Sequence, residues 1–295
     1  MRLDGVYPPI PTPFTADGEL ALEKLAQNME RWNKTGIAGY VVLGSNGEFV
    51  LLNENEKLEV VRTVREHAAR GKFVLAGTGC EGTIETIRFT KKAADAGADA
   101  AVLITPSYYR GKMDDAALQY HYETIADASP IPCILYNMPL NTGVDMSAGV
   151  VVKLAQHENI IAIKDSSGNV VKLGDVIRQA STDFQVFAGS AGFLYPAMAL
   201  GAVGGVLALA NIAPEQCVDM FSFAREGRHE EARQLQLRMI PANAAVTAGF
   251  GIAGLKAALD MVGLYGGPVR GPLRPLSDQQ KESLRGTLKT AGIIA

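Results

Sequence analysis

Short apolar runs alternate along the chain with longer stretches in which apolar residues recur every three or four positions. The apolar runs recur roughly every 25 to 35 residues, the length of a βα unit. They span residues 6–14, 39–44, 73–79, 98–106, 131–137, 160–165, 185–190 and 203–209. Several are apolar throughout, which is typical of parallel strands buried on both faces.

The intervening stretches have helical spacing and helix-terminating signals. The first of them places five apolar residues on one face, namely Leu22, Leu25, Ala26, Met29 and Trp32, before a stop at Gly36. In the second, Asn53 is a candidate N-cap with Glu56 three residues on. A third begins near Thr83 and stops at Gly97. These patterns predict helices between the strands.

Eight such units predict a (β/α)8 TIM barrel over residues 1–226, which would be the catalytic domain. A doubly wound sheet is the alternative, since a count of βα units does not by itself close a barrel. Residues 227–295 lose the strand pattern and indicate a C-terminal helical extension, with helices at about 229–242 and 250–262. After a connection rich in proline and glycine, Ser277 with Gln280 would cap a last helix.

Composition adds a soluble globular profile, with 47% hydrophobic and 20% charged residues among 295. The net charge of -3 and the scattered basic residues give no reason to expect nucleic acid or a membrane as a partner. We find no secretory signal and no apolar run of membrane-spanning length. Cys80, Cys133 and Cys217 fit neither a disulfide framework nor a metal-finger pattern, so we expect reduced thiols and a cytoplasmic location.

Lys164 is the one lysine that lies at the carboxyl end of a predicted strand, in the run "IIAIKD". In a barrel these strand ends face the active site. A lysine at a strand end can also simply extend its amine into solvent. However, other strand ends contribute hydroxyls and glycine turns to the same face, in "GSNGEF", "TPSYYRG", "YNMPLNTG" and "AGS". This convergence favours a functional role for Lys164.

An amine that is removed from water can become nucleophilic and form a Schiff base with a carbonyl substrate. The resulting iminium withdraws electrons, so the chemistry requires neither a metal nor another cofactor. It does require a proton shuttle, which Tyr136 with Tyr108 and Ser45 could provide. The turn "GSNGEF" could bind a carboxylate through the N–H groups of Ser45, Asn46 and Gly47, although an ordinary capped turn explains it as well.

Three other classes of function compete with this hypothesis. "GTGCEG", residues 77–82, matches the pattern of a dinucleotide-binding oxidoreductase, but the next strand ends in Thr105 and Pro106 rather than in an acidic residue. The four histidines lack metal-ligand spacing and are expected at the surface or at helix ends; they are His67, His121, His157 and His229. A non-enzymatic binding protein would not need a buried lysine at a strand end.

The motifs "GSNGE", "TPSYY", "YNMP…TG", "IKDSSG" and "AGSAGF", in this order, resemble those of the dihydrodipicolinate synthase and N-acetylneuraminate lyase superfamily over essentially the whole chain. The resemblance implies a class I aldolase mechanism on pyruvate or another 2-oxo acid, and a homotetramer built as a dimer of dimers. It implies that Lys164 forms the Schiff base and that Tyr136 relays protons. Ser45 would link Tyr136 to Tyr108, which would enter the site of a neighbouring subunit, although the adjacent Tyr109 could be the residue that crosses.

The same resemblance implies the substrate contacts. Ser45 and Asn46 would hold the pyruvyl carboxylate, and the backbone near Leu207 would touch the Schiff-base end. Ser166 would face the distal part of the substrate. Because Asn141 carries no positive charge, we expect a distal carboxylate to meet neutral donors around Ser166 to Gly168, Gly189 and Ser190.

Within the superfamily, "GSNGEF", "AGSAGFL", "NAAVT" and "YGGP" are most similar to 4-hydroxy-2-oxoglutarate aldolase, which releases pyruvate and glyoxylate. Dihydrodipicolinate synthase, which uses aspartate semialdehyde, normally carries two threonines at Ser45 and Asn46 and an arginine at Asn141. That synthase and a 2-keto-3-deoxy sugar-acid aldolase remain the alternatives.

Overall fold

The computed structural model describes residues 1–295 and contains one sheet of eight parallel strands, in the order β1-β8-β7-β6-β5-β4-β3-β2. The strands are β1 (Gly5–Tyr7), β2 (Gly39–Val42), β3 (Phe73–Gly77), β4 (Ala100–Ile104), β5 (Cys133–Asn137), β6 (Ile160–Asp165), β7 (Gln185–Ala188) and β8 (Gly204–Val206). The N–H groups of Ala38 and Val41 donate to the carbonyls of Val6 and Pro8, which brings β2 against β1. The predicted TIM barrel is therefore confirmed, and a doubly wound sheet is excluded.

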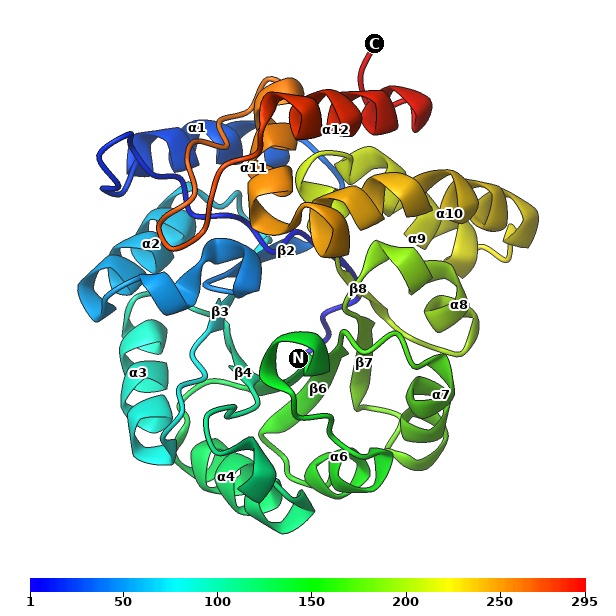
Figure 1. Cartoon of the computed structure of the whole chain (residues 1–295). Helices are drawn as coiled ribbons and strands as arrows, with labels where there is room; N and C mark the ends of the chain where they lie inside the picture. The colour runs from blue at the N-terminus through cyan, green and yellow to red at the C-terminus, as the bar shows by residue number, and fades with distance from the viewer.

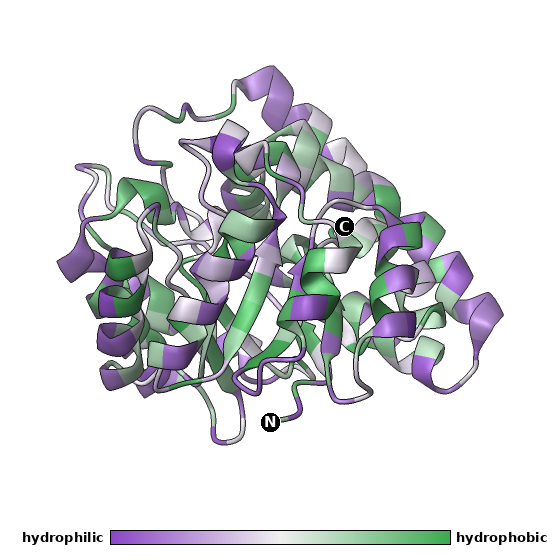
Figure 2. Ribbon diagram, turned by 90° about the horizontal axis from the view of Figure 1, so that it is seen from below, coloured by the Kyte–Doolittle hydropathy of each residue, from purple (hydrophilic) through white to green (hydrophobic).

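Helices surround the strands in a ring, as Figure 1 shows in a view along the barrel. They are α1 (Leu22–Trp32), α2 (Glu54–His67), α3 (Thr83–Asp95), α4 (Asp115–Ala128), α5 (Pro139–Thr142), α6 (Ala148–Leu154), α7 (Val170–Gln179), α8 (Leu194–Ala199) and α9 (Pro214–Arg225). Figure 2 shows the apolar strands enclosed by helices whose outer faces are hydrophilic. None of the helices is both long and apolar enough to span a bilayer.

The alternation of side chains along each strand produces two separate cores. One face of the strands packs against the helices in a cluster of 62 buried residues. The other face fills the barrel with a cluster of 11, among them Ile134, Ala162 and Phe187. Residues two positions further along these strands therefore point into the barrel at its carboxyl end.

The first strand is shorter than predicted. The apolar run 6–14 was expected to form it, but β1 ends at Tyr7 and only an isolated bridge from Pro9 to Val41 follows. Proline has no backbone N–H to donate to a ladder, and Pro8, Pro9 and Pro11 interrupt this run. The remaining seven runs each contain a strand.

The C-terminal region contains α10 (His229–Ala244), the π-helix η6 (Ala245–Gly249), α11 (Gly251–Met261) and α12 (Asp278–Thr290). Capping boxes form at Asn53 with Glu56 and at Ser277 with Gln280, as predicted. The proposed boundary between the barrel domain and the C-terminal region, after residue 226, falls in the turn between α9 and α10. Figure 1 shows α10 to α12 packed on the side of the barrel formed by α1, α8 and α9.

Candidate active site

Lys164 and Tyr136 lie side by side inside the carboxyl end of the barrel. They are paired in register on β6 and β5, and each is 4% exposed. Ile134 and Ala162, two residues earlier on the same strands, fill the barrel interior. The Lys164 amine lies 3.9 Å from the centre of the Tyr136 ring. The predicted pairing of these two side chains at the site is thus present in the fold.

Lys164 differs from the largely buried Lys172 and the buried Lys256 in having no acidic partner. Lys172 contacts Asp145 at 2.5 Å and Asp165 at 2.9 Å, and Lys256 contacts Glu48 at 2.5 Å. No carboxylate oxygen lies within 4.0 Å of the Lys164 amine. Since no ion pair occupies this amine, it can approach a carbonyl carbon in the cavity above it.

The residues that follow Tyr136 and Lys164 point outward and join the two strands. Asn137 donates to Asp165 at 2.9 Å. Asp165 also accepts from the N–H of Ser167 at 2.8 Å and from Lys172 at 2.9 Å. Burying a carboxylate is costly unless it is fully paired, as it is here. This network fixes the relative register of β5 and β6, and so the distance between the two side chains that point inward.

The turn after β2 brings Ser45 to Tyr136. Residues Ser45–Gly47 form the short 3-10 helix η1, and the Ser45 hydroxyl lies 3.4 Å from the Tyr136 hydroxyl. The Asn46 amide donates to the carbonyl of Pro9 at 3.4 Å. The Gly47 carbonyl accepts from the Thr12 hydroxyl at 2.7 Å. The hydroxyls of a candidate proton relay are therefore adjacent within one chain.

A cavity of about 460 Å³ opens above Lys164. Eight of the residues selected from the sequence line it, namely Ser45, Asn46, Tyr136, Asn141, Lys164, Ser166, Gly189 and Ser190. Ser167 and Gly168, from the same predicted donor segment, line it as well. Lys164 is the only charged residue in the lining. The cavity therefore offers hydroxyls, amides and backbone groups to a substrate, and one reactive amine.

Three of the selected residues do not line this cavity, namely Leu207, Gly47 and Tyr108. Leu207 is completely buried, and its neighbour Ala208 lines the cavity instead. Gly47 is buried beneath the turn with its carbonyl bound to Thr12. The predicted substrate contacts of Leu207 and Gly47 therefore lack support from the placement of these residues in the cavity wall.

Tyr108 lies outside the cavity of its own chain. Its side chain is 78% exposed, and its ring packs edge-on against Tyr109, with 5.0 Å between the ring centres. Glu81 holds the loop, because its carboxylate accepts from the N–H and hydroxyl of Ser107 and from the N–H of Tyr108. Burial alone would raise the pKa of Glu81, but these hydrogen bonds hold that pKa below its usual value. Hydrogen bonds to Glu81 thus tie down the backbone of this loop, while the Tyr108 side chain remains exposed.

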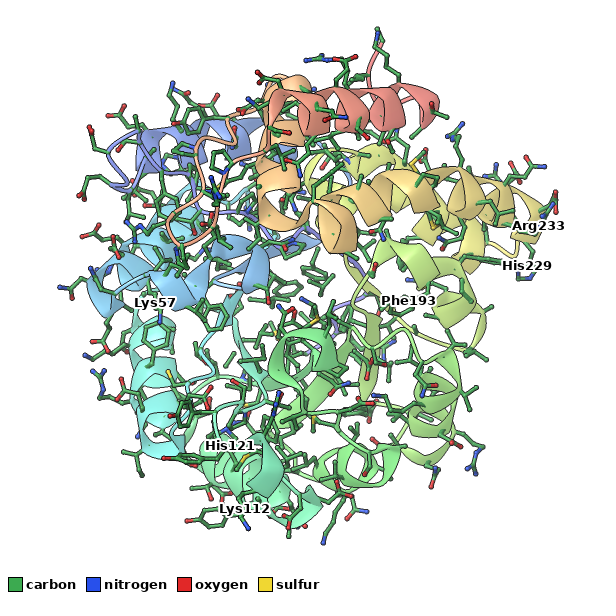
Figure 3. All side chains as sticks on the ribbon, in the orientation of Figure 1. Lys57, Lys112, His121, Phe193, His229 and Arg233 are labelled. Atoms are coloured by element: carbon green, nitrogen blue, oxygen red, sulfur yellow. The ribbon has the colours of Figure 1, made fainter.

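Part of the cavity wall was missed from the sequence because it comes from the C-terminal region. Val246, Thr247 and Ala248 of η6 line the cavity together with Ile252 of α11. Phe193, labelled in Figure 3, lines it from the side of β7. Such π-helices often occur at functional sites. The run "NAAVT", residues 243–247, carries no local signal that it lies over the barrel.

The predicted position of the histidines was wrong for His121. It lies on α4 and is 5% exposed, with Nδ1 2.9 Å from the Thr83 hydroxyl and a buried Nε2 that has no partner. Its place in the outer ring of helices is visible in Figure 3. Burial lowers the pKa of His121 to about 4, although Glu81 opposes the shift. No group of three or more histidine, cysteine or acidic residues is arranged to hold a metal ion.

Comparison with known proteins places this geometry in a family. A model described as the dihydrodipicolinate synthetase family matches residues 2–291. A 4-hydroxy-tetrahydrodipicolinate synthase from Methanothrix thermoacetophila is 40% identical over 285 residues, covering 96% of this chain and 95% of the relative. Another from Methanosarcina mazei is 37% identical over 292 residues, covering 99% of each chain.

Solved structures are equally similar. The chloride-inhibited dihydrodipicolinate synthase from Acinetobacter baumannii complexed with pyruvate superposes with a TM-score of 0.94 at 34% identity, covering 99% of this chain and 100% of that one. A prophage protein of the dihydrodipicolinic acid synthase family from E. coli K12 in complex with pyruvate superposes with a TM-score of 0.92 at 32% identity, with the same coverage of both chains.

The barrel, its site and these matches define a pyruvate-dependent lyase of the class I, Schiff-base-forming type. The chain belongs to the dihydrodipicolinate synthetase family. The expected closeness to 4-hydroxy-2-oxoglutarate aldolase is not supported, since the relatives described above are named as synthases.

Proposed function

We propose that the protein joins pyruvate to a small aldehyde, or releases it by the reverse reaction, through an imine on Lys164. The observation that carries this proposal is the Lys164 amine itself, which is buried, free of any ion pair and 3.9 Å from the Tyr136 ring centre beneath an open cavity. The amine adds to the C2 carbonyl of pyruvate, and loss of water gives the iminium. Loss of a C3 proton then gives an enamine, which attacks the aldehyde carbon.

Tyr136 would carry the protons of these steps. Its hydroxyl would accept and return the proton at the carbinolamine oxygen and later at the new alcohol of the product. Ser45, 3.4 Å from that hydroxyl, would pass protons to and from it. Tyr108 is exposed in its own chain, which suits an entry into the site of a neighbouring subunit in a homotetramer. The adjacent Tyr109 is 70% exposed and remains the alternative.

The two ends of the substrate would be held by different parts of the cavity. Ser45 and Asn46, beside Tyr136, would bind the pyruvyl carboxylate. Ser166, Gly189 and Ser190, from the ends of β6 and β7, would bind the distal end. All of these groups are neutral, so selectivity for an anionic aldehyde would be modest compared with a site that contains arginine.

The names of the relatives favour aspartate semialdehyde as the aldehyde substrate. Those described above carry the name of 4-hydroxy-tetrahydrodipicolinate synthase at 37% and 40% identity over nearly the whole chain. On this reading the product is 4-hydroxy-tetrahydrodipicolinate.

A second candidate is the cleavage of 4-hydroxy-2-oxoglutarate to pyruvate and glyoxylate. One observation favours it: Asn141 lines the cavity where synthases normally place an arginine, and no other cation compensates. The substrate has the 2-oxo group that the imine needs and a hydroxyl at C4 that can lose its proton as the C3–C4 bond breaks. A 2-keto-3-deoxy sugar acid meets the same chemical requirements.

Two measurements test the proposal and separate the candidates. Borohydride reduction in the presence of pyruvate, followed by peptide mapping, should attach the pyruvyl group to Lys164; attachment elsewhere, or none, would contradict the imine. The kcat/KM for condensation of pyruvate with aspartate semialdehyde is then compared with that for 4-hydroxy-2-oxoglutarate cleavage. The larger value identifies the reaction. If a sugar acid is cleaved faster than either substrate reacts, both candidates are wrong.

A further inference from the structure

Glu48 ends the motif "GSNGE", and its buried charge has no role in the reaction proposed above. Its side chain is completely buried. The carboxylate contacts the amine of Lys256 at 2.5 Å and accepts from the backbone N–H of Arg270 at 2.9 Å. Both partners belong to the C-terminal region, more than 200 residues away along the chain. A buried carboxylate therefore connects the turn beside Tyr136 to α11 and the segment that follows it.

The turn held in this way has an unfavourable backbone conformation. Leu43 and Glu48, which flank Ser45–Gly47, have φ values of 60° and 54°. Residues other than glycine adopt this left-handed conformation at a cost, and it persists where the surroundings enforce it. At Glu48 the enforcing contacts are the hydrogen bond that its side chain accepts from the Arg270 N–H and the ion pair with Lys256. Without them, the turn that carries Ser45 and Asn46 loses a principal restraint.

Lys256 is fitted closely into this position. Its amine also donates to the carbonyl of Pro268 at 2.8 Å and lies 4.3 Å from the centre of the Phe14 ring. The chain after α11 folds back tightly over it, because a Cβ at Gly266 would lie 1.9 Å from the Lys256 carbonyl oxygen. The "YGGP" glycines thus allow the lysine to be enclosed. Burial lowers the pKa of Lys256, while the Glu48 carboxylate opposes that shift.

We propose that Glu48 and Lys256 are positioning residues that set the affinity for pyruvate, by holding Ser45 and Asn46 in the conformation that binds its carboxylate. The C-terminal region would then act on the reaction through this ion pair, in addition to its contribution to the cavity wall. The inference rests on the proposed function, since it assigns Ser45 and Asn46 to the pyruvyl carboxylate.

The test compares E48Q, K256M and the double variant E48Q/K256M with the wild-type protein. The double variant is the decisive one, because it leaves no unpaired buried charge and so is expected to fold. Glu48→Asp, which keeps the charge but shortens the side chain, is the milder probe if the others do not fold. For each, borohydride trapping gives the pyruvate concentration at half-maximal labelling and the final extent of labelling at Lys164.

We expect the half-maximal concentration to rise roughly tenfold or more in E48Q, K256M and the double variant, because each loses the ion pair that holds the turn. It should rise less in Glu48→Asp. Labelling at saturating pyruvate should remain complete, because Lys164 itself is untouched. Asp99→Asn is the matched control, since it breaks a half-buried ion pair at the opposite end of the barrel. In this pair Arg65 Nη1 lies 3.0 Å from Asp99 Oδ2. Asp99→Asn should lower the melting temperature without changing the pyruvate concentration at half-maximal labelling.

A folded double variant with wild-type pyruvate dependence would overturn this proposal, as would an equal change in Asp99→Asn. If the wild-type protein itself is not labelled by pyruvate, the proposed function fails instead, and the two failures are thereby distinguished.

Discussion

Tyr136 and Lys164 occupy the same level of two adjacent parallel strands, and the lysine amine lies 3.9 Å from the centre of the tyrosine ring. A hydroxyl and an amine carried on rigid strands can address one small molecule from fixed positions. Precise placement is what allows a general acid or base to act on a bound intermediate. The Tyr136 hydroxyl has one hydrogen-bonding partner within the chain, the Ser45 hydroxyl at 3.4 Å.

Tyr136→Phe should therefore affect turnover far more than stability. Removing the hydroxyl deletes the proposed proton relay, which is worth roughly 100- to 10,000-fold in kcat. The phenyl ring still fills the barrel, so the free energy of unfolding should change by no more than about 1 kcal/mol, the usual value of one hydrogen bond. Steady-state kinetics and denaturant unfolding measure the two quantities.

Tyr122→Phe is the matched control for Tyr136→Phe. Tyr122 is completely buried on α4, and its hydroxyl donates to the Leu103 carbonyl at 3.3 Å, outside the cavity. The variant should lose a little stability and keep its kcat. A decrease of less than tenfold for Tyr136→Phe would move the proton relay to another group.

The parts of this protein that could be predicted from sequence are those set by local pattern. Uniformly apolar runs identified the strands, and the side-chain oxygen of Asn53 identified the start of α2. Lys164 could be predicted because the active site of a barrel lies at the carboxyl ends of its strands, and Lys164 is the lysine at such an end. From there, the alternation of side chains placed Ser166 beyond it, and both residues do line the cavity.

The parts that could not be predicted depend on contacts between distant segments. The ion pair of Lys256 with Glu48 is formed only when α11 packs beside the turn after β2, and nothing in the run "GLKAAL" indicates it. His121 has the spacing of an ordinary helix residue, yet α4 turns it inward against Thr83. In both cases the neighbours that matter are supplied by tertiary packing.

His121 should make the protein less stable in mild acid. Its pKa is about 4 in the folded chain, because burial disfavours the charged ring, and about 6.5 when unfolded. Unfolding therefore takes up a proton between these values. The stabilisation is complete above about pH 6.5 and falls toward pH 4, by roughly 3 kcal/mol in total. Denaturant unfolding at a series of pH values measures this slope.

His121→Gln should abolish this part of the pH dependence, whereas His67→Gln should leave it unchanged because His67 is exposed at the end of α2. An unchanged slope in His121→Gln would assign the acid sensitivity to the carboxylates.

Asn141→Arg tests how the distal end of the substrate is recognised. Asn141 lies on α5 in the wall of a cavity whose only charge is Lys164. An arginine there would add a charge-assisted pair to any aldehyde that carries a distal carboxylate, and should raise kcat/KM for it by roughly tenfold. A neutral aldehyde should gain nothing, and Asn141→Gln should change neither reaction by more than about threefold. Condensation of pyruvate with aspartate semialdehyde, with glyoxylate and with glycolaldehyde provides the comparison. If the neutral aldehyde gains as much as the two acids, the side chain at position 141 acts through the shape of the cavity and not through charge.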